Sequence, residues 1–105
     1  MLLCVTILHA CRKVSDMKIT GLYWDDENVE HISMHDVTPA EVEDICFETH
    51  IAYSGTDDRY ILYGQTENGR YLKVVLKRLH GTVFRPITAF EMSESEKHNY
   101  RKSFK

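Results

Sequence analysis

Apolar and polar residues follow two different periods along this chain, and the first half has the helical one. Residues 18–24 are rich in β-branched and aromatic side chains and predict an opening strand. Acidic residues 25–27 follow, where a helix N-terminus favours negative charge, and they predict a short helix that ends near Met34. Residues 38–41 form a capping box with proline at the first helical position, and the apolar residues after it keep helical spacing.

The second half has the strand period of two. The predicted strands are residues 59–66, 70–78 and 82–89. Asn68-Gly69 is a favoured hairpin turn between the first two, and His80-Gly81 is a weaker turn before the third. Residues 93–96 then open a basic terminal helix through another capping box. The whole pattern predicts an α+β fold: a strand, two helices, a three-stranded antiparallel meander and a C-terminal helix.

With 105 residues, the chain has room for one hydrophobic core. We expect a single domain at 17–105, while residues 1–16 are an N-terminal extension or an extra strand. The apolar start lacks a basic segment and is shorter than the roughly 20 residues of a membrane span, so we expect no membrane partner.

The three cysteines are an odd number without CxxC spacing, which favours reduced, buried thiols in the cytoplasm over disulfides. Cys4, His9 and Cys11 lie close together but have no fourth partner with recognisable spacing, so we expect no metal site there. His31 and His35 lie four residues apart without the glutamate of an HExxH motif. His35 is therefore either a proton carrier or a simple complement to the helix end.

Charge separates the two halves of the chain. Residues 1–58 carry three basic and twelve acidic residues, a net charge of -9, whereas residues 59–105 carry ten and four, a net charge of +6. Because successive strand side chains point to opposite faces, Lys73 and Lys77 share one face with Tyr71 and Val75. Arg59 and Arg85 join this face if the register is right. Such a basic, partly aromatic surface suits single-stranded RNA, or it simply complements the acidic half.

Four segments, taken in order, resemble one known family. They are residues 18–24 followed by acids, residues 34–41, residues 59–64 with 67–70, and residues 85–89 leading to Met92, Ser93 and Tyr100. Together they resemble the BrnT family of toxins from bacterial type II toxin-antitoxin pairs. The resemblance covers the chain from Met17 onward.

This resemblance implies a RelE-like ribonuclease fold, metal-independent cleavage of RNA without a cofactor, and a DNA-binding protein antitoxin as partner. Carried over by position, Arg59 and Arg85 are the phosphate-binding cations and His35 is the proton carrier. The RNA-binding residues expected beside them are Trp24, Arg70, Lys73 and Lys77, with two roles open for the Trp24 ring: stacking on a base or packing within the fold. Cations stabilise the charge that develops on the attacked phosphate, so these residue types suit the chemistry.

The chain departs from the family pattern at two cations, since Met34 stands in place of Lys and Phe90 in place of Arg. Asp36 and Glu91 add negative charge nearby. Three interpretations follow. The chain is an RNA-cleaving toxin, a degenerate homologue that binds RNA or an antitoxin without cleavage, or a scaffold that self-associates into a homo-oligomer.

Overall fold

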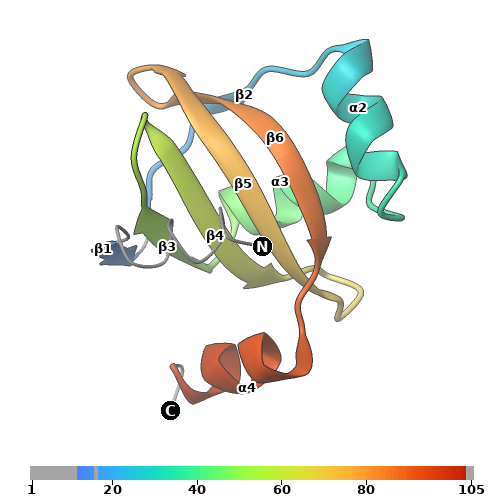
Figure 1. The fold of residues 1–105 in the computed structure, drawn as a ribbon, viewed down its shortest axis with the longest axis vertical. Helices are drawn as coiled ribbons and strands as arrows, with labels where there is room; N and C mark the ends of the chain where they lie inside the picture. Colours follow the sequence, from blue (N-terminus) through green and yellow to red (C-terminus); the bar gives the residue numbers. More distant parts are fainter. Residues whose placement is uncertain (1–11, 16, 104–105) are drawn as a thin grey trace.

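The computed structural model describes residues 12–15 and 17–103 of the 105-residue chain. Within these residues a six-stranded sheet packs with three helices, which confirms the predicted α+β class (Figure 1). The strands are β1 (Arg12–Ser15), β2 (Gly21–Leu22), β3 (His50–Ser54), β4 (Arg59–Gln65), β5 (Tyr71–His80) and β6 (Val83–Glu91). The helices are α2 (Asp26–Ser33), α3 (Pro39–Phe47) and α4 (Glu94–Lys102).

Four consecutive strands, β3 to β6, form an antiparallel meander, and two short strands complete the sheet edges. β1 pairs antiparallel with β3, so residues 12–15 form a strand. β2 pairs parallel with β6 and contains only two residues of the strand expected at 18–24. Flanking backbone hydrogen bonds, such as that from the Tyr23 amide to the Phe84 carbonyl at 2.9 Å, hold the rest of this segment along β6.

β3 is a fourth meander strand beyond the three predicted. Its five residues include Ala52, which has a weak strand preference, and the polar His50, so the local pattern does not mark it. His50 is buried because both ring nitrogens have partners. The Met17 amide donates to Nε2 at 3.0 Å, and Nδ1 lies 3.0 Å from the Ile45 carbonyl oxygen. Contacts distant in sequence therefore stabilise this strand.

The hydrophobic core lies between one face of the sheet and helices α2 and α3. Leu72, Val74 and Leu76 on β5 are fully buried there, whereas their neighbours on the strand are only half-buried on the other face. This confirms the predicted alternation. We call the face that α2 and α3 cover the inner face and the opposite one the outer face; α3 lies behind the sheet in Figure 1.

Local capping and one close contact position these helices. α2 and α3 both begin with a capping box, and the α2 box pairs Asp25 with Asn28. Asn28 is buried because its side-chain amide also donates to the carbonyls of Tyr23 and Pro86, each at 3.0 Å. At Gly64, an added Cβ would lie 2.9 Å from Ile45 Cδ1, so glycine lets α3 pack closely against β4.

α4 follows β6 and lies apart from the other two helices, below the sheet in the view of Figure 1. The Ser93 hydroxyl at its N-cap accepts from the Glu96 amide, and the Ser93 amide donates to the Glu96 carboxylate, which completes the predicted capping box. None of its residues is buried, so side-chain contacts at its surface hold it against the outer face. No helix in the described part of the chain is long and apolar enough to cross a membrane.

Candidate functional site

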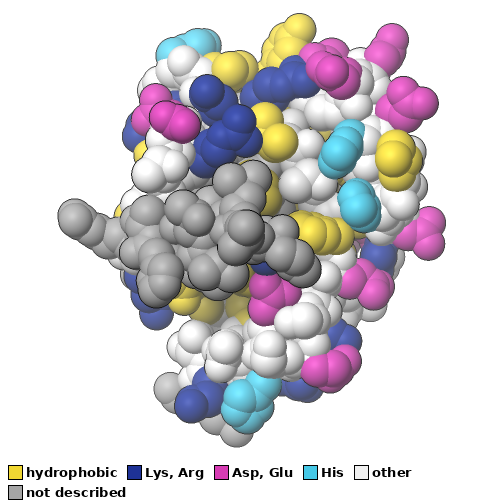
Figure 2. Space-filling view, viewed as in Figure 1, with side chains coloured by type: hydrophobic (Ala, Val, Ile, Leu, Met, Phe, Trp, Pro, Cys, Tyr) yellow, Lys and Arg dark blue, Asp and Glu magenta, His cyan; other side chains and the backbone are white. Residues whose placement is uncertain are grey.

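Three cations lie side by side across the outer face. The register places Arg59 of β4 opposite Lys77 of β5, and Lys77 opposite Arg85 of β6. The register therefore puts Arg59 and Arg85 on the same face as Lys77, as expected. We call these three residues the cationic row. Figure 2 shows Lys and Arg side chains gathered over the upper strand ends of this face. Directly opposed like charges destabilise a sheet.

The members of the cationic row differ in how their charge is neutralised. Arg85 forms ion pairs with Asp25, the N-cap of α2, and with Glu27 at 3.2 Å. The hydrogen bond from Arg85 holds the pKa of the Asp25 carboxyl below its usual value. No carboxylate of the described residues forms an ion pair with Arg59 or Lys77. Within the described residues, the row therefore keeps two cations that no carboxylate pairs with.

A second row crosses the outer face toward α4. Here Ile51, Tyr63, Lys73 and Phe90 oppose one another on successive strands β3 to β6, and we call them the aromatic row. Lys73 Nζ lies 5.8 Å from the Tyr63 ring centroid and 5.3 Å from that of Phe90. It also pairs with Glu96 of α4 at 2.9 Å.

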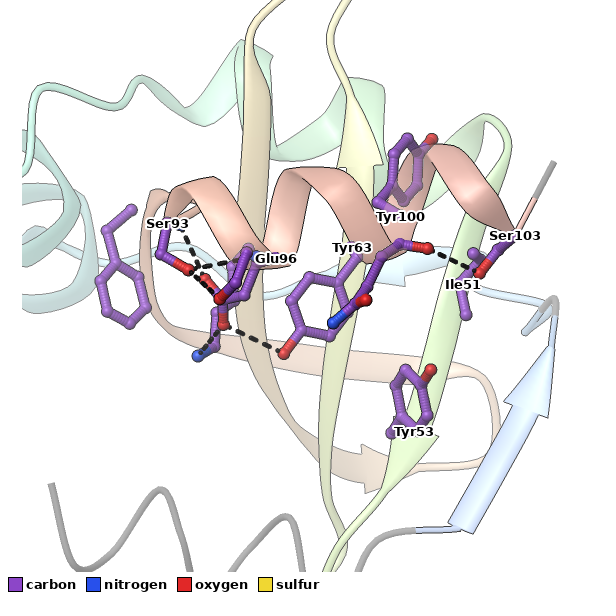
Figure 3. Close-up of a pocket in the computed structure, with 11 residues that line it drawn as sticks. Ile51, Tyr53, Tyr63, Ser93, Glu96, Tyr100 and Ser103 are labelled. Carbon is purple, nitrogen blue, oxygen red and sulfur yellow. Dashed lines mark hydrogen bonds and ion pairs between the residues drawn. The ribbon is translucent and has the colours of Figure 1, made fainter. Parts of the chain in front are cut away.

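α4 and the aromatic row enclose a pocket of about 580 Å³, which we call the α4 pocket (Figure 3). Burial alone would raise the pKa of Glu96 at its edge, but hydrogen bonds from Lys73 and from the Ser93 backbone outweigh burial and lower it. Lys73, expected to bind RNA, is thus one half of an ion pair in this pocket.

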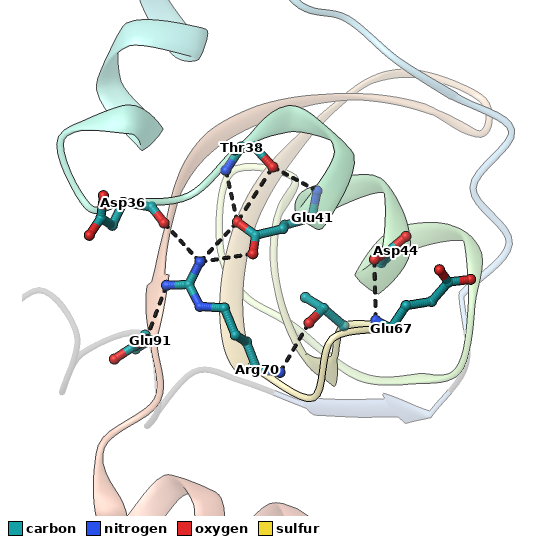
Figure 4. Close-up of polar contacts among 8 residues, drawn as sticks. Asp36, Thr38, Glu41, Asp44, Glu67, Arg70 and Glu91 are labelled. Atoms are coloured by element: carbon teal, nitrogen blue, oxygen red, sulfur yellow. Dashed lines mark hydrogen bonds and ion pairs between the residues drawn. The ribbon is translucent and has the colours of Figure 1, made fainter.

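Arg70 forms hydrogen bonds and ion pairs within the fold (Figure 4). Its Nη1 donates to both carboxylate oxygens of Glu41 at 2.9 Å and to the Asp36 carbonyl at 2.8 Å, and Nη2 donates to Glu91 at 3.1 Å. Glu41 belongs to the capping box of α3. Burial alone would raise the pKa of Glu41, but the hydrogen bonds from Arg70 and Thr38 prevail and lower it. Arg70 therefore joins α3 to β5 and β6.

His35 lies at the opposite end of β6 from the cationic row. Its exposed ring is 5.5 Å from the Phe90 ring and 5.7 Å from the His31 ring, measured between centroids. Together with Arg70, Phe90 and Glu91 it lines a hollow of about 400 Å³. Phe90 and Arg85 are five positions apart on β6, roughly 16 Å at the rise of a strand. The structure therefore does not bring His35, Arg59 and Arg85 together at one phosphate.

Trp24 packs against the hydrophobic core and is only partly exposed. Its Nε1 is buried and has no hydrogen-bond partner among the described residues. Of the two roles weighed for this ring, packing is the one that its surroundings favour.

Cysteine and metal chemistry find little support in the part of the chain that the structure describes. Cys46 is buried, and burial raises the pKa of its thiol to about 12, so it stays protonated and unreactive. No group of three or more His, Cys, Asp or Glu residues within 12–15 and 17–103 is arranged to hold a metal. Cys4, His9 and Cys11 lie outside the described residues.

Sequence reasoning missed Tyr53, Glu96 and Tyr100 as lining residues of the α4 pocket. A strand at 50–54 would have placed Tyr53 on the outer face, but only the tertiary pairing reveals that strand. The sequence predicts Glu96 as a capping residue of the terminal helix. In the structure Glu96 caps α4 and also accepts a hydrogen bond from Lys73.

Comparisons with known proteins do not decide the family. A scan against protein-family models gives no match, and searches of curated proteins and of solved structures also give none.

Proposed function

We propose that this chain binds RNA through the cationic row, as a toxin-like protein of the BrnT type. One observation carries the proposal: three cations stand in direct register, and two of them have no carboxylate partner among the described residues. Opposed like charges cost folding free energy, and phosphates bound across the row would remove that cost. Aromatic side chains on the same face suit a nucleic acid better than a small inorganic anion.

The competing interpretation treats the basic half as an internal complement to the acidic half. It accounts for Arg70, bound to Glu41, and for Arg85, bound to Asp25 and Glu27. It does not account for Arg59 and Lys77. This difference between the four cations favours a ligand for the row over a purely structural role.

The test is the affinity for a single-stranded RNA, measured by fluorescence anisotropy with purified protein. Arg59→Ala and Lys77→Ala each weaken binding several-fold, because each removes one phosphate contact. The matched control is Lys102→Ala, which removes an exposed cation of α4 and leaves the affinity unchanged. Equal affinity in all four proteins would contradict the proposal.

Cleavage of RNA is a second candidate, and the hollow at His35 favours it. Metal-independent cleavage needs a proton carrier and a cation near one phosphate, and His35 and Arg70 line the same hollow. Against this, Glu41 and Glu91 already engage the Arg70 guanidinium. Binding is therefore the primary proposal and cleavage the second.

A metal-free cleavage assay separates the two candidates. If His35 carries the proton, His35→Ala lowers the cleavage rate by about 100-fold or more while RNA affinity stays the same. The control is His98→Ala, an exposed histidine on α4. RNA left intact by the wild-type protein would exclude the enzyme and leave the binding module.

The BrnT resemblance also suggests a cytoplasmic protein antitoxin as partner. A neighbouring reading frame that encodes a small DNA-binding protein, and whose product purifies with this chain, would support that partner. Size-exclusion chromatography of the purified chain alone tests the remaining scaffold interpretation, which requires a homo-oligomer.

A further inference from the structure

The α4 pocket has the lining of a site for a planar ligand. Tyr53, Tyr63 and Phe90 line it from the sheet, and Tyr100 lines it from α4 (Figure 3). All four rings are half-buried, so they combine a fixed position with an accessible surface. Its volume of about 580 Å³ is within the range of small-molecule sites.

Ring geometry gives the pocket a stacking surface. Tyr53 and Tyr63 come from adjacent strands and meet edge to face, with centroids 5.9 Å apart and an interplanar angle of 87°. Both rings line the pocket, so they present aromatic surface to its interior. A base has a π-face whatever its identity, which makes aromatic side chains a general platform for stacking.

The charges in the pocket argue against a phosphate and for a neutral ligand. Lys73 and Glu96 form an ion pair at 2.9 Å, and the Tyr63 hydroxyl also donates to Glu96 at 3.3 Å. The Glu96 carboxylate offsets the Lys73 charge and would repel an anion. Serines and Asn99 also belong to the described lining, and their neutral donors and acceptors match the edge of a nucleobase.

The pocket also continues the cationic row along the same face. Lys73 and Lys77 are four positions apart on β5 and point to the same side, roughly 13 Å apart at the rise of a strand. Proteins that bind single strands combine a cationic track for the backbone with aromatic rings for the bases. The outer face carries both features, because the cationic row and the aromatic row both cross β5, at Lys77 and at Lys73.

From these contacts we infer that the α4 pocket accepts one unpaired nucleobase of an RNA strand whose phosphates lie on the cationic row. This inference rests on the proposed RNA binding and adds the requirement for a single strand. Stacking in the pocket then favours a strand with bases over an abasic strand, whereas the cationic row binds the phosphates of both strands equally.

The experiment compares two fluorescently labelled strands with the same number of phosphates, a mixed-sequence RNA and its abasic counterpart. The wild-type protein binds the abasic strand about 10-fold more weakly, within the range measured for stacking of one base. Tyr53→Leu abolishes this difference by removing a ring. Asn99→Trp abolishes it by filling the pocket from an exposed position of α4, so the test does not depend on one variant folding.

Phe47→Leu is the matched control, because Phe47 is an exposed aromatic residue at the end of α3, outside the pocket. It keeps the full preference for bases, and none of the variants changes the salt dependence of binding. Equal affinity of the wild-type protein for both strands overturns the inference but leaves the proposed function intact. No binding of either strand overturns both.

Discussion

Arg59 and Arg70 have the same side chain, but their surroundings assign them different tasks. The guanidinium of Arg70 is held by two carboxylates and a backbone carbonyl. Arg59 has no ion-pair partner within the described residues and faces Lys77 across the strand pair. At the scale of single residues, Arg70 therefore stabilises the fold, whereas Arg59 is the cation that we propose for a ligand.

Arg70→Met lowers the free energy of unfolding by about 2 kcal/mol, because it leaves the Glu41 carboxylate, with a side chain only 14% exposed, without its cation. Urea unfolding measures this change. Arg59→Met is the control and changes the free energy of unfolding by about 0.5 kcal/mol or less. Similar losses in the two variants would contradict the roles assigned to the two arginines.

Acid should weaken the same contact. Because the pKa of Glu41 is lowered from 4.5 in the folded protein, the unfolded chain binds more protons as the pH falls. The stability contributed by Glu41 is complete above pH 4.5 and is lost as the pH falls through the folded pKa. The difference in urea midpoint between wild type and Glu41→Gln therefore shrinks below about pH 4.5. A difference that is constant with pH would contradict this account.

At the scale of elements, α4 differs from α2 and α3 in how it is held. α2 and α3 contribute buried apolar residues to the core, but α4 contributes none. It is held by the pair of Lys73 with Glu96 and by the contact of Tyr100 with Tyr71. Loss of one such contact should loosen this helix without unfolding the sheet.

Lys73→Met leaves Glu96 partly buried without a cation, so α4 opens more often. We expect amide hydrogen exchange in α4 to accelerate by about 10-fold, while exchange in α3 stays unchanged. Lys77→Met is the matched control, since Lys77 lies on the same face of the same strand and has no carboxylate partner among the described residues. Faster exchange of α4 in both variants, or in neither, would contradict this description.

For the whole molecule, the charge asymmetry between the halves has two outcomes. Part of it is neutralised internally, since Asp25 and Glu41 from the acidic half bind Arg85 and Arg70 from the basic half. Arg59 and Lys77 on the outer face are among the cations of the basic half that no carboxylate of the described residues pairs with. The ion pairs thus fit internal complementarity at Arg70 and Arg85, and RNA binding stays our proposal for Arg59 and Lys77.

Local chemistry explains which features the sequence could predict. The capping boxes at Thr38 and Ser93 and the alternation on β5 depend on near neighbours, and the structure contains them. The pairing of β3, the acceptors around Arg70 and the pocket under α4 depend on residues far apart in the chain. Such contacts are determined by register and packing, which a single sequence does not reveal.

The salt dependence of RNA affinity tests the central claim most directly. For a single strand, the slope of log affinity against log salt changes by about 0.7 for each phosphate contact. We predict that the Arg59→Ala/Lys77→Ala double variant has a slope about 1.4 units shallower than the wild type. A double variant that removes the exposed Lys18 and Lys102 keeps the wild-type slope. Equal slopes for the two double variants, or no RNA binding by the wild-type protein, would contradict the account.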